Sequence, residues 1–139
     1  MPGDRFEVRV VGRVESPLTA MESAPRQGDE GAPDAWIEFE PDVIDALDGV
    51  EPGTRIVIVS WLDRADRDVL EVHPRGDTSR PRVGVFATRS PHRPNPIGLH
   101  PVEVLEVDGS RIRVAGLEAL DGTPVLDVKP LLEGEISER

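Results

Sequence analysis

Hydrophobic and polar residues alternate with a period of two along much of the chain, which is typical of β-strands with one buried face. The clearest case is the pair of alternating segments 102–107 and 111–115, separated by Asp108-Gly109-Ser110. An Asp-Gly pair between such segments favours a tight turn, because glycine readily adopts a positive φ. The pattern therefore predicts a β-hairpin.

Other segments carry weaker versions of the same signal. Residues 56–62 form a continuous apolar, β-branched run, which predicts a strand buried on both faces. The only helix that we expect is one or two turns at 42–47, between Pro41 and Gly49. The remaining predicted strands lie at residues 6–10, 36–39, 69–72, 83–87 and 125–128.

About seven short strands with one short helix predict a mainly all-β fold, a single β-barrel domain spanning residues 1–139. The 14 prolines and 13 glycines are spread through the sequence and leave no room for long helices. Residues 18–35 are rich in Ala, Pro, Gly and acidic residues and predict a long loop. Residues 133–139 predict a flexible tail.

Composition narrows the functional classes. The chain has no cysteine, no apolar core of a signal peptide and no apolar run long enough for a membrane span, so we expect a cytoplasmic protein without a membrane partner. A net charge of −11 argues against a general binder of DNA or RNA backbones. Residues 55–93, however, carry eight arginines against five acidic residues. That segment is either a nucleic-acid contact or a solvated loop of Arg–Asp pairs.

Residues 86–99 form the most informative stretch. Asn95 lies between Pro94 and Pro96, which restrict the backbone on both sides, while Arg89 and Arg93 precede it. A stiff loop that presents an amide and guanidinium groups can pair with an adenine edge or a carboxylate. The alternative is an ordinary proline-stiffened loop of a barrel.

Other candidates are less specific. The three histidines, His73, His92 and His100, show no metal-ligand spacing, so we expect no metal site. Asp127 and Lys129 would lie on one face of a strand, where they could simply neutralise one another.

Together these pieces resemble the TrmO/TsaA-like family of S-adenosylmethionine-dependent tRNA N6-methyltransferases. The resemblance runs in the family's order through nearly the whole chain. Its segments are residues 11–17, Pro25-Arg26-Gln27, the strand at 56–62, residues 84–90, Arg93-Pro94-Asn95-Pro96-Ile97-Gly98 and residues 121–130.

The resemblance implies a β-barrel methyltransferase that works as a homodimer with the cofactor near the subunit interface. It also implies S-adenosylmethionine as methyl donor and N6 of threonylcarbamoyladenosine, beside the tRNA anticodon, as acceptor. The chain departs from the family at Asp63, often a histidine, and at Glu118, often an aspartate, and it lacks a C-terminal extension found in some members. Carried over by position, the cofactor contacts fall on Pro25, Arg26, Gln27, Leu62, Asp63, Arg89, Leu99, Gly116, Leu117 and Glu118.

We expect Arg26 or Arg89 to clamp the methionine carboxylate and Asn95 to orient cofactor or acceptor. Asp63, Glu118, Asp121 and Asp127 are the available bases, of which Asp63 and Asp127 join Asn95 as catalytic candidates. The negative net charge and the expected absence of the extension favour one alternative, a methyltransferase acting on a small molecule. A second alternative is a non-catalytic protein that binds S-adenosylmethionine. The arginines expected to contact tRNA phosphates are Arg64, Arg67, Arg75, Arg80, Arg82 and Arg93.

Overall fold

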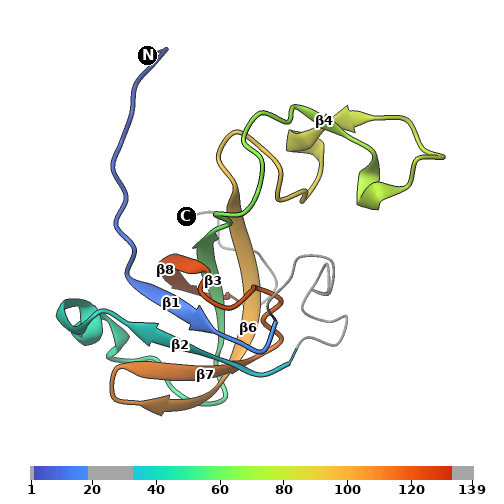
Figure 1. The fold of residues 1–139 in the computed structure, drawn as a ribbon. Coiled ribbons are helices and arrows are strands. Elements are labelled where there is room, and N and C mark those ends of the chain that lie inside the picture. The colour runs from blue at the N-terminus through green and yellow to red at the C-terminus, as the bar shows by residue number, and fades with distance from the viewer. Residues whose placement is uncertain (1, 19–32, 133–139) are drawn as a thin grey trace.

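A computed structural model describes residues 2–18 and 33–132 (Figure 1). Six antiparallel strands close into a barrel, which confirms the predicted all-β barrel. The loop expected at 18–35 and the tail expected at 133–139 lie largely or wholly outside the described residues. In order around the barrel the strands are β1 (Gly12–Glu15), β2 (Ala35–Phe39), β7 (Arg111–Ala115), β6 (Ile97–Asp108), β3 (Arg55–Trp61) and β8 (Pro124–Pro130).

The predicted hairpin is formed by β6 and β7, and Gly109 in its turn has a φ of 62°. β6 extends further toward the N-terminus than its alternation suggests, beginning at Ile97. Its first half pairs with β3, where Ser60 lies opposite Gly98 and Ile58 opposite His100. β6 therefore links the hairpin to the far end of the barrel.

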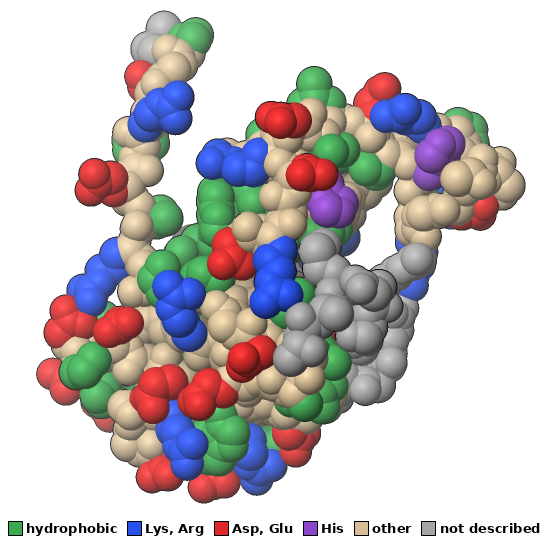
Figure 2. Space-filling model, viewed as in Figure 1, with side chains coloured by type: hydrophobic (Ala, Val, Ile, Leu, Met, Phe, Trp, Pro, Cys, Tyr) green, Lys and Arg blue, Asp and Glu red, His purple; other side chains and the backbone are tan. Residues whose placement is uncertain are grey.

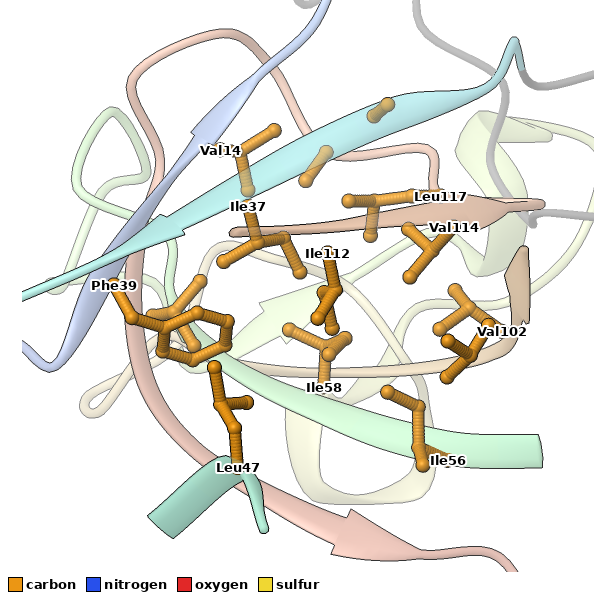
Figure 3. Packing of buried hydrophobic residues seen from close by; sticks show 14 residues of the cluster. Val14, Ile37, Phe39, Leu47, Ile56, Ile58, Val102, Ile112, Val114 and Leu117 are labelled. Atoms are coloured by element: carbon orange, nitrogen blue, oxygen red, sulfur yellow. The ribbon is translucent and has the colours of Figure 1, made fainter. Parts of the chain in front are cut away.

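The core fills the barrel interior with β-branched side chains from all sides (Figure 3). Ile37, Ile58 and Ile112 are fully buried at its centre. Leu47 comes from the 3-10 helix η3 (Pro41–Leu47), where the sequence predicts a short helix, and covers the end of the core near Phe39. Each such side chain contributes about 1.5–3 kcal/mol when removed from water, so the alternating inward positions supply the stability of the fold.

Between β3 and β6 the chain leaves the barrel, and we call residues 62–96 the excursion. It carries a small two-stranded sheet, β4 (Glu71–Val72) with β5 (Val83–Gly84), and stands out from one end of the barrel (Figure 1). Two short 3-10 helices, η4 (Pro74–Gly76) and η5 (Val85–Ala87), complete it. The strand predicted at 83–87 is thus wrong in its second half, because the chain turns into η5 after Gly84.

The strand predicted at residues 6–10 does not form. The side chains of Phe6 and Val8 are 89% and 67% exposed, and the segment leads away from the barrel as an extended arm (Figure 1). Pairing of β1 begins only at Gly12, and Arg9 is held by an ion pair to Asp42 at 2.6 Å. Alternation specifies two faces of a strand but supplies no neighbour for it, which is why the prediction failed here.

Candidate functional site

A wide cleft of about 2150 Å³ lies between the excursion and the adjoining end of the barrel. Its walls come from the excursion, from the first residues of β6, from the last residue of β7 and from residues 116 and 118–120 after it. Basic, histidine and acidic side chains are mixed on the excursion, whereas acidic side chains gather, with some basic ones among them, at the opposite end of the barrel (Figure 2).

Arg93 stabilises the wall formed by residues 85–93. Its Nη1 donates to the carbonyl oxygens of Thr88 and Ser90, both at 3.0 Å, and its Nη2 donates to that of Val85 at 3.0 Å. A planar guanidinium with several donors can bridge carbonyls in this way, whereas an ammonium cannot match the geometry. Arg93 is committed to the protein's own backbone, which leaves it little capacity for the phosphate contact expected of it.

Arg67 plays a comparable role for the Pro-Asn-Pro segment. Its Nε donates to the carbonyl of Pro94 at 2.7 Å and its Nη2 to Oδ1 of Asn95 at 3.1 Å. The guanidinium also lies over the ring of Trp61, 5.1 Å from its centroid. The side-chain oxygen of Asn95 therefore accepts a hydrogen bond from Arg67, and Asn95 is an exposed residue of the cleft wall.

A buried polar network lies where the cleft meets the barrel interior. His100 is 4% exposed, and its Nε2 lies 2.6 Å from Oγ of Ser60, which is fully buried. Its Nδ1 lies 2.5 Å from Oε1 of Glu118. Oε2 of the same carboxylate is buried and has no hydrogen-bond partner among the described residues. Because nearly all buried polar atoms in proteins are paired, this oxygen marks a place where a donor is missing.

Gly98 packs directly against this network, which leaves no space for a side chain. A Cβ at Gly98 would lie 2.6 Å from Oγ of Ser60 and 2.7 Å from Nε2 of His100, inside the closest contacts that Cβ atoms make. The sequence indicates Gly98 as a point of close approach, and the structure identifies what approaches it.

The chain matches the family model described as tRNA-methyltransferase O N-terminal domain over residues 13–134. It belongs to the tRNA-methyltransferase O family. This confirms the resemblance found in the sequence.

Members of this family with curated descriptions are close in sequence. A probable S-adenosyl-L-methionine-binding protein of Methanothermobacter thermautotrophicus is 48% identical over 128 residues, covering 92% of this chain and 91% of the relative. Another, of Archaeoglobus fulgidus, is 49% identical over 124 residues, covering 89% of this chain but only 33% of the relative.

Solved structures of the family share the fold. A crystal structure of TrmO from Pseudomonas aeruginosa superposes with a TM-score of 0.77 at 28% identity, covering 98% of this chain and 61% of that one. A further TrmO crystal structure gives a TM-score of 0.77 at 29% identity, covering 98% of this chain and 62% of that chain. The chain thus spans about three-fifths of these TrmO chains and a third of the Archaeoglobus relative.

The structure brings most of the family's candidate cofactor residues to one cleft. Leu117 is the exception among the described ones, because its side chain is fully buried in the core. Pro25, Arg26 and Gln27 lie outside the described residues. The candidates that line the cleft are Leu62, Asp63, Arg89, Leu99, Gly116 and Glu118.

Of the candidate catalytic and RNA-binding residues, some line the cleft and others do not. Asn95 lines the cleft, but Asp127 is not part of its lining and instead pairs with Lys129 at 3.6 Å on the outside of β8. Arg67 is likewise absent from the lining, and Arg82 donates to the carbonyl of Glu71 at 3.2 Å. The predicted RNA arginines that line the cleft are Arg64, Arg75, Arg80, Arg82 and Arg93.

Sequence reasoning missed Ser60 and the role of His100, which it considered only for metal binding. Both are inward-facing positions of strands, and the alternation of β3 and β6 could have placed them on the core side. A polar residue at a core position is the signal that was available. Across the described residues, no group of three or more His, Cys, Asp or Glu could hold a metal ion, and no helix is long and apolar enough to cross a membrane.

Proposed function

We propose that this protein binds S-adenosylmethionine in the cleft and transfers its methyl group to N6 of threonylcarbamoyladenosine in tRNA. The observation that carries the proposal is Oε2 of Glu118, which is buried at the wall of the cleft and has no hydrogen-bond partner within residues 2–18 and 33–132. A bound molecule rich in hydrogen-bond donors and carrying a cationic centre suits a carboxylate that lacks a donor. The membership of the family and the descriptions of the relatives as S-adenosyl-L-methionine-binding proteins support the same ligand.

The residues of the cleft fit the parts of this cofactor. The exposed guanidinium of Arg89 can clamp the methionine carboxylate, and Glu118 can accept hydrogen bonds from the nucleoside. Leu62 and Leu99 offer apolar contact. When bound, the cofactor supplies an electrophilic methyl group on its sulfonium. The protein's own contribution is to hold the acceptor nitrogen in line with that methyl group.

Two cleft residues are our candidates for handling the acceptor. The amide nitrogen of Asn95 is available to orient it, since only the side-chain oxygen is used by Arg67. Asp63 is exposed on the cleft wall and could take the proton that the N6 nitrogen loses. Asp127 would need a second subunit or another route to reach the acceptor, because it lies outside the cleft lining.

The association and location of the protein are also proposals. We expect a homodimer with the cofactor close to the interface, located in the cytoplasm. Leu99 and Ile97 support this arrangement, since they line the cleft and yet remain 41% and 45% exposed on the outer face of β6.

The test is mass spectrometry of tRNA nucleosides from a strain with and without the gene, combined with calorimetry on the purified protein. We expect N6-methyl-threonylcarbamoyladenosine to disappear on deletion and S-adenosylmethionine to bind the wild type. Arg89→Ala should weaken that binding by roughly 1.5–3 kcal/mol, the value of a charged hydrogen bond. An unchanged nucleoside profile together with cofactor binding would refute the tRNA acceptor.

One observation favours a second candidate, methylation of a small molecule. Three of the six arginines expected to contact tRNA, namely Arg67, Arg82 and Arg93, bond to the protein's own backbone, and the net charge is −11. Turnover of a free metabolite with no affinity for tRNA at low salt would select this candidate. Cofactor binding without turnover of either substrate would select the non-catalytic alternative.

A further inference from the structure

The polar network of Ser60, His100 and Glu118 at the base of the cleft suggests how the protein orients its cofactor, an inference that rests on the proposed function. We propose that His100 is a positioning residue, which Ser60 holds by one ring nitrogen while the other orients the Glu118 carboxylate toward the cofactor. The carboxylate oxygen left over, Oε2, then receives a donor of the bound molecule.

The strand register places the network. Ser60 on β3 and His100 on β6 both face the barrel interior, at the end of the apolar core. The imidazole lies between two partners, at 2.6 Å from the serine hydroxyl and 2.5 Å from the carboxylate. Both ring nitrogens are therefore engaged, which leaves the ring no freedom to rotate without losing a hydrogen bond.

A neutral imidazole satisfies the whole network: Nδ1–H donates to Oε1 of Glu118, and Nε2 accepts from the hydroxyl of Ser60. The carboxylate selects this tautomer, because an ionised carboxylate only accepts hydrogen bonds, whereas the serine hydroxyl can donate or accept. The carboxylate keeps its negative charge and one unused oxygen.

In many hydrolases a serine nucleophile, a histidine base and a carboxylate that orients the histidine form the catalytic triad. That role is excluded here by burial, because Ser60 is 0% exposed and cannot meet a substrate. Glu118, in contrast, lines the cleft and its side chain is 16% exposed. The serine is the buried end of the network, and the carboxylate is the end that faces a ligand.

Gly98 supports the inference independently. A side chain there would collide with both atoms of the Ser60–His100 hydrogen bond. Gly98, which lies two residues after Pro96, is thus required by this bond, and it connects the stiff Pro-Asn-Pro loop to the orientation of Glu118.

Two substitutions of His100 separate its two contacts. In His100→Asn the side-chain amide occupies the place of Nδ1 and can still donate to Glu118; in His100→Gln it occupies the place of Nε2 and keeps only Ser60. We expect calorimetry to show a Kd for S-adenosylmethionine about ten-fold higher for His100→Gln, and a smaller change for His100→Asn. Glu118→Gln should weaken binding as His100→Gln does, and the double variant should show no further loss.

Ser60→Ala provides a second route if the His100 variants do not fold. It should weaken binding moderately, because the ring loses its buried anchor. Ser110→Ala is the control: its hydroxyl also makes a hydrogen bond to a side chain, the carboxylate of Glu38, but at the hairpin end of the barrel. Folded His100→Gln that binds the cofactor like the wild type would overturn the positioning role.

A readout without cofactor separates this inference from the proposed function. Imidazole ¹⁵N NMR of the free protein should show an Nδ1–H tautomer for His100 in the wild type and a changed signal in Glu118→Gln. Wild-type protein that shows this signal yet ignores S-adenosylmethionine and its demethylated product would overturn the proposed function. An imidazole signal that Glu118→Gln leaves unchanged would overturn the His100–Glu118 contact, and with it the inference.

Discussion

Gly98→Ala tests the packing of the candidate site with the smallest change that the chain allows. The methyl group would lie 2.6 Å from Oγ of Ser60 and 2.7 Å from Nε2 of His100, both on buried residues of the barrel interior. Gly98 does not have a positive φ, so alanine meets no backbone strain there. The entire effect therefore comes from the contact with the network.

The magnitude follows from two costs. Overpacking by one methyl group in a well-packed interior costs about 1–3 kcal/mol. Separating Ser60 from His100 leaves a buried hydroxyl and a ring nitrogen without partners, which costs about 1–3 kcal/mol more. The same movement of Ser60 and His100 that relieves the overpacking also breaks their hydrogen bond, so the two costs do not add fully. We expect a loss of roughly 2–4 kcal/mol in the free energy of unfolding. For a domain of this size that lowers Tm by about 6–12 °C.

The assay is urea and thermal denaturation of the variant beside Gly84→Ala as a matched control. At Gly84 the nearest atom to an added Cβ is the carbonyl oxygen of Leu70 at 3.9 Å, and the backbone angles, φ −63° and ψ 144°, suit alanine. The control should be neutral or gain about 0.4–1 kcal/mol from a less flexible unfolded chain.

A double variant identifies the cause. In a Ser60→Ala background, Gly98→Ala should cost less than it does alone, because the hydroxyl contact and its hydrogen bond are already gone. A Gly98→Ala protein as stable as Gly84→Ala would refute the reasoning, since the close contacts would then not exist in solution.

Three further predictions concern the excursion. Arg93→Lys should lower the free energy of unfolding by about 2–3 kcal/mol and speed amide exchange around residues 85–93, because one ammonium cannot replace guanidinium donors on three carbonyls; unchanged exchange would contradict this. Ser79→Ala should raise the pKa of Asp77, which hydrogen bonds from the Ser79 hydroxyl and amide hold below its usual value, as carboxyl NMR titration can show. A carboxyl whose pKa is lowered by folding stabilises the protein above its usual pKa, and this stabilisation is lost as the pH falls through the pKa of the folded state. The difference in the free energy of unfolding between wild type and Ser79→Ala should therefore vanish in acid. Arg80→Ala should reduce by about one the slope of log affinity for tRNA against log salt, and an unchanged slope would remove Arg80 from the proposed phosphate surface.

Local features were predictable because their causes are local. The β6–β7 hairpin follows from Asp108-Gly109 between two alternating segments, and the short helix η3 follows from Pro41 and Gly49. The strand β3 was evident from its β-branched run. In each case the residues that form the element also carry the signal.

The arm at residues 6–10 shows that an alternating pattern alone does not predict a strand. Its residues alternate as those of a strand do, yet Phe6 is 89% exposed because no strand of the described chain pairs with it. Arg67 and Arg93 show the same limit for function. Their charge indicated a nucleic-acid surface, while the folded chain uses their guanidinium groups to hold the cleft wall.

By itself the sequence determined the fold class, most of the strands and the membership of a family, because these depend on patterns and motifs that are contiguous along the chain. Only the tertiary structure decided that Ser60, His100 and Glu118 meet under Gly98, since strand register brings together residues separated by 40 and 18 positions. Alternation with a period of two indicates which face of the sheet a side chain lies on. The pairing of whole strands determines which side chains become its neighbours.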